Sequence, residues 1–98
     1  MVIKVIEGER EYTLTFIELC EQCQIPPEAL SALLAHGLLE TSVEETQFDV
    51  AMIHRIQSAA RLQRDLQLNT QGAVLALELM DKIEALREEL RMLRRFLS

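Results

Sequence analysis

The sequence has no lysine or arginine between Arg10 and Arg55, although ten of these residues occur among its 98 positions. Residues 11–54 hold eight acidic residues and a formal charge of −8, while residues 1–10 are neutral and residues 55–98 sum to +2, which gives the net charge of −6. The eight are Glu11, Glu18, Glu21, Glu28, Glu40, Glu44, Glu45 and Asp49. A protein that binds DNA gains most of its non-specific affinity from cations near phosphates. The missing cations therefore argue against specific nucleic-acid binding and for a partner with a basic surface.

Long apolar runs and glycine-rich loops are also missing. No apolar run reaches the ~18 residues that a membrane-spanning helix needs, and Met1–Ile6 is too short for the apolar part of a secretion signal. Two cysteines without a signal fit a reducing compartment, so we expect a cytoplasmic protein that does not bind membranes. No nucleophile stands at a recognisable spacing from a base, and no glycine-rich phosphate loop occurs. We therefore expect no enzyme, no cofactor and no small-molecule substrate.

The two cysteines form the short motif Cys20-Glu21-Gln22-Cys23. A redox motif of this kind should follow a strand, whereas this one lies near the end of an expected helix. A zinc site would need two further ligands, and only His36 and His54 are available, at unsuitable spacing. We therefore predict no metal site, a buried Cys20 that packs as a small apolar side chain, and a partly exposed, oxidisable Cys23. His36 is expected to donate to the last carbonyls of a helix.

The first residues predict a small strand or hairpin. Met1–Ile6 is apolar and β-branched, Glu11–Leu14 is a second short extended run, and a turn containing Gly8 separates them. A capping box then begins at Thr15, because Glu18 stands three residues later and each side chain can bond the other residue's backbone N–H. A short helix follows to about Gln22, with Phe16, Leu19 and Cys20 buried.

A helix-turn-helix is predicted next. The second helix runs from about Pro27 to Ala35, with Leu30, Leu33 and Leu34 on one face, and Gly37 ends it. Two short helices joined by a tight turn form this unit. Leu38–Phe48 is interpreted as a wing that contains a short strand at Thr46-Gln47-Phe48.

The second half of the chain predicts two longer helices. Asp49 can cap a third helix over about Val50–Leu66. Its expected buried stripe is Ile53, Ile56, Ala60 and Leu62 or Leu66. Asn69 or Thr70 can cap a fourth helix.

Apolar residues of this fourth helix repeat with alternating spacings of three and four, which is a heptad pattern. They are Ala76, Leu79, Ile83, Leu86, Leu90, Leu93 and Leu97. Residues 71–97 would extend ~40 Å as a helix, which is more than a core of this size can cover. The helix could fold back on its own domain, but the full heptads favour contact with another chain. We therefore predict a homodimer with its interface at Leu79, Ile83, Leu86, Leu90, Leu93 and Leu97. The expected organisation is a winged helix-turn-helix domain at 1–68 and a dimerisation helix at 69–98, in one compact unit.

The orientation of the two helices stays open at this point. A parallel pairing would set Glu89 against Arg94 favourably and Lys82 against Arg87 unfavourably.

The order of these elements resembles the MerR-type winged helix-turn-helix. The matching residues are Thr15, Glu18-Leu19, Ile25, Leu30, His36-Gly37-Leu38-Leu39, Asp49 and Ile53 with Ile56. Within that group the chain is most similar to the CbpM chaperone modulators. This pattern recurs in Phe16 with Glu18-Leu19-Cys20, in Gly37-Leu38-Leu39-Glu40, in Glu45-Thr46-Gln47-Phe48-Asp49, and in two stretches within 60–68 and 73–83. The implied fold is mainly α, a MerR-like winged helix-turn-helix with a small β hairpin or wing and a long C-terminal coiled-coil helix.

The resemblance implies a bacterial protein–protein inhibitor. CbpM proteins bind the J-domain of the DnaJ-like co-chaperone CbpA and block its stimulation of the chaperone DnaK. A J-domain presents a basic helix, which an acidic surface free of cations would complement. Glu18 and Asp49 are expected to cap helices, so the predicted partner-binding residues are Glu21, Glu28, Glu40, Glu44 and Glu45. The arginines of the third and fourth helices are an alternative partner-facing set.

Two other functions remain open from the sequence. One is a MerR-like transcriptional regulator with degenerate DNA contacts. DNA-binding relatives carry arginines in the second helix and wing, where this chain has Leu33-Leu34-Ala35 and Glu44-Glu45. The other is a purely structural coiled-coil adaptor.

Overall fold

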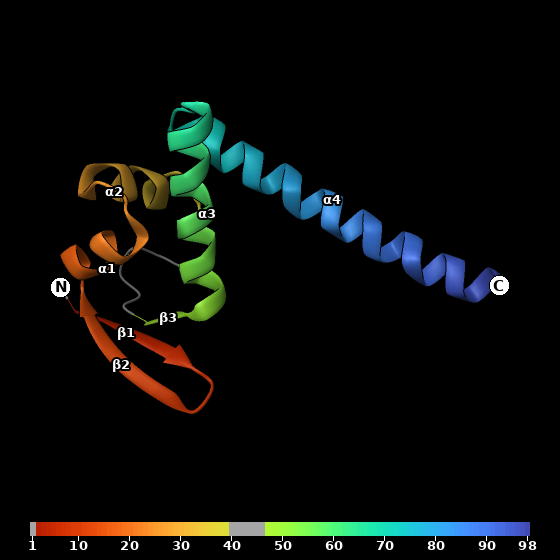
Figure 1. Cartoon of the computed structure of the whole chain (residues 1–98), viewed down its shortest axis with the longest axis horizontal. Helices are drawn as coiled ribbons and strands as arrows, with labels where there is room; N and C mark the ends of the chain where they lie inside the picture. The colour runs from red at the N-terminus through yellow and green to blue at the C-terminus, as the bar shows by residue number, and fades with distance from the viewer. Residues whose placement is uncertain (1, 40–46) are drawn as a thin grey trace.

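A three-stranded sheet and four helices make up the computed structural model, which describes residues 2–39 and 47–98 (Figure 1). The strands are β1 (Val2–Glu7), β2 (Arg10–Thr15) and β3 (Gln47–Asp49), in the order β2-β1-β3. β1 pairs antiparallel with β2 and parallel with β3. The helices are α1 (Phe16–Cys23), α2 (Pro27–Ala35), α3 (Val50–Leu66) and α4 (Thr70–Leu97). The mainly helical fold, the hairpin and the long last helix confirm the predicted fold class.

The β1–β2 hairpin turns at Gly8, whose φ of +63° suits a residue without a Cβ atom. Period-two alternation gives the sheet one buried face, to which β1 contributes Ile3 and Val5 and β2 contributes Leu14. β3 adds Phe48 to the same core. The expected hairpin is therefore confirmed.

α1 begins at the capping box predicted from the sequence. The Thr15 hydroxyl accepts from the Glu18 N–H at 3.1 Å, and the Glu18 carboxylate accepts from the Thr15 N–H at 2.9 Å. The bond from the Thr15 N–H, followed by the contribution of the Thr15 side chain, lowers the pKa of the Glu18 carboxyl below its ordinary value, because hydrogen bonds to the carboxylate stabilise the ionised form. The helix ends where Gln24 takes a left-handed conformation with φ 54°.

α2 starts directly after Pro26 and has Leu30 and Leu33 in the core. At its end His36 Nδ1 lies 2.9 Å from the Ala32 carbonyl, which can only accept, so Nδ1 carries the proton. Gly37 then turns the chain with φ +83°. The predicted helix-turn-helix, the bounds of its second helix and the role of His36 are confirmed.

α3 is capped by Asp49, whose carboxylate accepts from the Met52 N–H at 2.8 Å. Its buried residues are Ile56, Ala59 and Ala60, and Ile53 and Leu62 are half-buried. Leu66 is 62% exposed, so the expectation that it could belong to the buried stripe is wrong. It is the last residue of the helix, and the left-handed Gln67 that follows turns the chain away.

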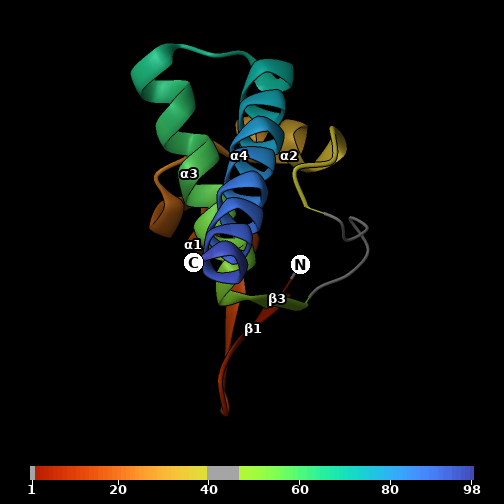
Figure 2. The same cartoon turned by 90° about the vertical axis from the view of Figure 1, so that its right-hand side faces the viewer.

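α4 buries apolar side chains in the domain only through its first two turns. Asn69 caps it by accepting from the Gly72 N–H at 2.7 Å, and Ala73, Val74 and Leu77 are buried. Beyond Asp81, which pairs with Arg55 of α3, the helix projects away from the other elements (Figures 1 and 2). The alternative in which the helix folds back on its own domain is therefore wrong for this part of α4. The division at residue 68 remains a prediction, although the first turns of α4 lie within the core.

Candidate functional site

α1 and α2 expose acidic residues and contain no lysine or arginine. Glu21 on α1 and Glu28 in the first turn of α2 are both exposed. Both carboxylates lie close enough to Cys20 to help raise the pKa of its thiol, after the larger effect of burial. Two of the five predicted partner-binding acids therefore share one neighbourhood. Glu40, Glu44 and Glu45, with most of the predicted wing, lie outside the described residues.

The cations nearest to the helix-turn-helix hold its backbone in place. Arg55 Nε donates to the Leu38 carbonyl at 2.7 Å, just after α2. Arg64 Nη1 donates to the Gln24 carbonyl at 2.8 Å, in the turn before α2. Both arginines come from α3, so α3 fixes both ends of α2. A guanidinium bound to protein carbonyls is less available to a phosphate, and α1 and α2 contain no lysine or arginine.

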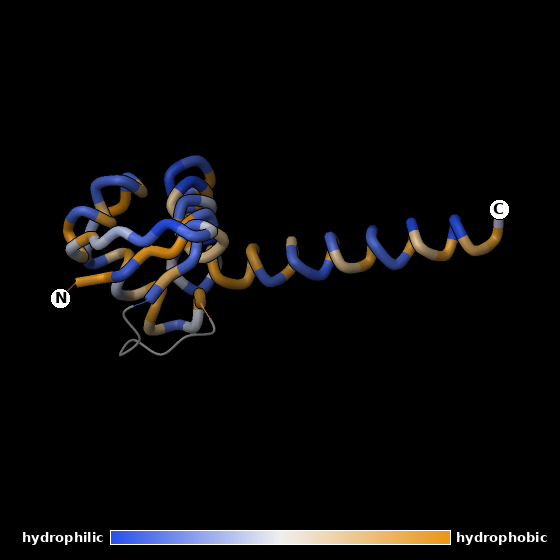
Figure 3. Tube along the Cα trace, turned by 90° about the horizontal axis from the view of Figure 1, so that it is seen from below, coloured by the Kyte–Doolittle hydropathy of each residue, from blue (hydrophilic) through white to orange (hydrophobic). Residues whose placement is uncertain are grey.

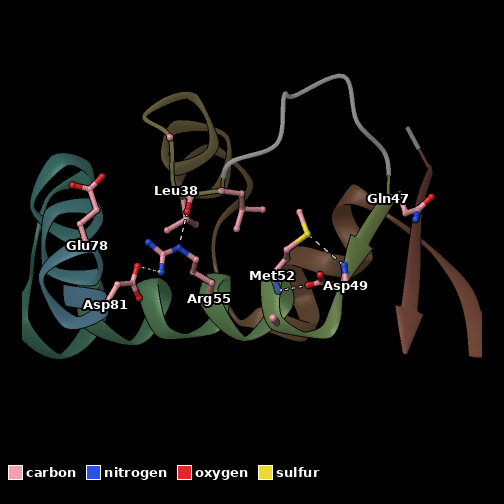
Figure 4. Close-up of a pocket in the computed structure, with 10 residues that line it drawn as sticks. Leu38, Gln47, Asp49, Met52, Arg55, Glu78 and Asp81 are labelled. Atoms are coloured by element: carbon pink, nitrogen blue, oxygen red, sulfur yellow. Dashed lines mark hydrogen bonds and ion pairs between the residues drawn. The ribbon is translucent and has the colours of Figure 1, made fainter. Parts of the chain in front are cut away.

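A groove of about 660 Å³ lies where the end of α2, the start of α3 and the middle of α4 meet (Figure 4). Arg55 links its walls, because its Nη1 atom also lies 2.8 Å from the Asp81 carboxylate of α4. The described residues that line it are Gly37, Leu38, Leu39, Gln47, Asp49, Ala51, Met52, Arg55, Glu78 and Asp81. The lining thus combines apolar side chains with three carboxylates and one guanidinium.

Both cysteines are buried, each with 3% of its surface exposed. The expectation of a partly exposed Cys23 is wrong, because α1 runs to Cys23 and places it on the same face as Leu19 and Cys20. Burial raises the pKa of both thiols, and the other thiol adds to this effect at Cys23. A protonated, buried thiol reacts poorly. The residues that the structure describes contain no group of three or more metal-binding side chains.

The predicted dimer residues of α4 form an exposed apolar line (Figure 3). Their exposed fractions are 50% for Leu79, 48% for Ile83, 63% for Leu86, 47% for Leu90, 58% for Leu93 and 83% for Leu97. Arg91 lies on another side of the helix, where it pairs with Glu84 and Glu88. Six large apolar side chains on one line of a helix are unusual for a surface in water. None of the helices in 2–39 and 47–98 is both long enough and apolar enough for a membrane crossing.

Sequence reasoning did not predict the backbone contacts of Arg55 and Arg64 or the positions of Glu78 and Asp81 in the groove. Arg55 and Asp81 are separated by a turn and lie on two different helices, and no local pattern signals their contact. The acidic residues Glu78 and Asp81 lie in a segment with near-balanced charge, so composition gives no hint of the groove.

Comparison with known proteins gives matches over most of the chain. Residues 14–95 match the family described as MerR HTH family regulatory protein. The chain is 37% identical over 98 residues to the chaperone modulatory protein CbpM of Coxiella burnetii (strain Dugway 5J108-111), covering 97% of this chain and 92% of the relative. It is 38% identical over 89 residues to the chaperone modulatory protein CbpM of Escherichia coli O1:K1 / APEC, covering 88% of each. No solved structure gives a significant match.

Proposed function

This chain belongs to the CbpM family of chaperone modulatory proteins, within the MerR helix-turn-helix family, and we propose that it binds the J-domain of a DnaJ-like co-chaperone and blocks its stimulation of DnaK. The coarser role, chaperone modulation, follows from the family. A modulator of this kind is a binding protein rather than an enzyme. We place it in the bacterial cytoplasm, where such a co-chaperone acts.

One observation carries the proposal: the two helices of the helix-turn-helix expose acidic residues and contain no lysine or arginine. Glu21 and Glu28 are exposed on α1 and α2, and the nearby Arg55 and Arg64 are bound to backbone carbonyls. The resemblance to CbpM implies a basic helix on the J-domain, and opposite charges would speed the encounter of the two proteins. Single ion pairs at a rim are weak, so apolar contacts beside the acids must supply much of the affinity.

The test compares association rates of the parent and a neutralised variant with an isolated J-domain, at low and high salt. The variant carries Glu21→Gln, Glu28→Gln, Glu44→Gln and Glu45→Gln. We expect slower association of the variant at low salt and a smaller difference at high salt, because salt screens exposed charges. Equal rates at low salt would refute the acidic-surface mechanism, and no binding by the parent would refute the proposed partner.

The second candidate, a MerR-like regulator with degenerate DNA contacts, is favoured only by the family fold. We expect non-specific DNA affinity of ~10⁻⁴ M or weaker at physiological salt. A sequence-selective gel shift at sub-micromolar protein would favour this alternative.

We also propose that the chain is a homodimer through α4, with the two helices antiparallel. One antiparallel register packs the apolar line in layers that each occur twice by symmetry: Ile83 against Leu86, Leu79 against Leu90, and Ala76 against Leu93 of the second copy. Leu97 then lies at the edge, against the start of the second α4. Fully burying a leucine contributes roughly 1.5–3 kcal/mol before entropic costs.

The flanking residues favour the antiparallel orientation. In this register Lys82 lies beside Glu89 of the second copy, twice by symmetry, and no two like charges face each other along the seam. The exposed Leu75 and Phe96 are also brought together. A parallel pairing offsets its two Glu89–Arg94 attractions with two Lys82–Arg87 repulsions. The charge pattern therefore supports the antiparallel arrangement.

A further inference from the structure

We propose that the groove between α2, α3 and α4 is the part of this protein that takes up a lysine or arginine side chain of the basic partner. This inference rests on the proposed function, because it assigns a docking position to the same partner. It differs from the acidic face at Glu21 and Glu28 in shape, since here acids surround a hollow with an apolar lining (Figure 4).

The lining matches the two chemical parts of such a side chain. Leu38, Leu39 and Met52 supply apolar surface, against which the methylene stem of a lysine or arginine can pack. Carboxylates from two different elements stand around them, Asp49 at the end of β3 and Glu78 and Asp81 on α4. An occupant with an apolar stem and a cationic end therefore finds both kinds of contact in one place.

The charge balance of the groove is negative. Among the described residues of the lining, three carboxylates face one guanidinium, which leaves a formal charge of −2 for these residues. Arg55 is already engaged by the Leu38 carbonyl at 2.7 Å and by Asp81 at 2.8 Å. Among the described residues no hydrogen bond or ion pair engages Glu78, which is exposed on α4. Glu78 is thus the carboxylate best placed to meet an incoming cation, whereas an anionic occupant would be repelled.

The groove is also held in shape before any partner arrives. The Arg55 side chain is only 25% exposed and bridges two elements that are far apart in the sequence, the end of α2 and the middle of α4. Asp49 is fixed by its bond to the Met52 N–H at 2.8 Å. A site whose walls need little ordering loses less free energy on binding.

Two variants and a matched control test this position. Glu78→Lys reverses the unengaged charge, and Ala51→Trp fills the groove from an exposed position on α3. Glu9→Lys makes the same charge reversal at an exposed position in the hairpin turn, away from the groove. We expect Glu78→Lys and Ala51→Trp to raise the Kd for an isolated J-domain by at least about tenfold, with Glu9→Lys close to the parent. Thermal unfolding of each variant checks that it is folded.

Methionine methyl signals in NMR spectra give a second readout that needs no substitution. Met52 lines the groove. On addition of the J-domain we expect the Met52 methyl signal to shift.

The outcomes separate the two proposals. If both groove variants bind the J-domain as tightly as the parent and the Met52 methyl signal does not shift, the groove assignment is wrong while the proposed function stands. If Glu9→Lys weakens binding as much as Glu78→Lys, the effect is long-range charge and the assignment also fails. If the parent binds no J-domain, both proposals fall together.

Discussion

Apolar side chains are buried in the body of the domain but exposed on the outer part of α4. In the body, leucines such as Leu19, Leu30 and Leu33 are fully buried, and side chains cap the starts of α1 and α3. In α4 beyond Leu77, leucines recur just as regularly, yet each remains about half exposed or more. The body therefore buries its apolar side chains within its own core, whereas those of the outer helix need a second surface to cover them.

The largest effect that separates the two regions is expected from Leu86→Glu. In the proposed register Leu86 packs against Ile83 of the second copy, twice by symmetry, so the change removes two buried leucines and places two carboxylates in the apolar seam. We expect sedimentation to give the dimer mass for the parent and the monomer mass for the variant, with a folded body by circular dichroism. Arg95→Glu, on another side of α4, is the matched control and should stay dimeric. A dimeric Leu86→Glu protein, or a monomeric parent, would contradict the proposed interface.

Leu33→Ala should instead destabilise the body and leave the α4 seam unchanged, because it removes a fully buried side chain from the body. The cavity should lower the free energy of unfolding by about 2–5 kcal/mol, measured by urea denaturation at a fixed protein concentration. Ser31→Ala, an exposed change on the same helix, should stay within about 0.5 kcal/mol of the parent. A loss no larger than that of the control would show that Leu33 contributes little to the core.

A charge exchange at Lys82 and Glu89 tests whether the two α4 helices run parallel or antiparallel. Lys82→Glu should weaken an antiparallel dimer, because the new carboxylate would then face Glu89, but should strengthen a parallel dimer by pairing with Arg87. Each flanking pair contributes on the order of 0.5 kcal/mol. The double variant Lys82→Glu with Glu89→Lys should recover the parent dimer dissociation constant, measured by sedimentation. Tighter dimerisation of the single variant would show that the helices run parallel.

A modest effect, confined to the body, is expected at the start of α1. Thr15→Ala should cost about 1 kcal/mol of stability by removing the cap. The lowered pKa of Glu18 means that its contribution is present above the ordinary value of 4.5 and is lost as the pH falls through the lowered pKa. The Glu18→Gln variant should therefore lose less stability than the parent between neutral and acidic pH. Thermal unfolding at each pH measures this loss. Identical pH profiles would show that the ionised Glu18 does not stabilise the helix start.

The sequence predicted best what depends on neighbouring residues. The caps at Thr15 and Asp49 and the stop at Gly37 are local chemistry, so the helix bounds of the body followed from them. The burial of Cys23 was missed because it depends on one further residue of helix. The Arg55–Asp81 contact and the groove around it arise only when α3 and α4 pack together, and no sequence spacing encodes that. Of the predicted acidic site, Glu21 and Glu28 are exposed on α1 and α2, and their role in partner binding stays a prediction.

The proposed inhibition of a basic co-chaperone by the acidic body is tested most directly by the ATPase activity of DnaK. This protein is titrated into DnaK that is stimulated by a CbpA-type co-chaperone. In the control, DnaK is stimulated by a J-domain protein that CbpM proteins do not bind. We expect the stimulated rate to fall to the basal rate of DnaK once this protein exceeds the co-chaperone, without any change in the basal rate. A stimulated rate that persists at excess protein would contradict the account.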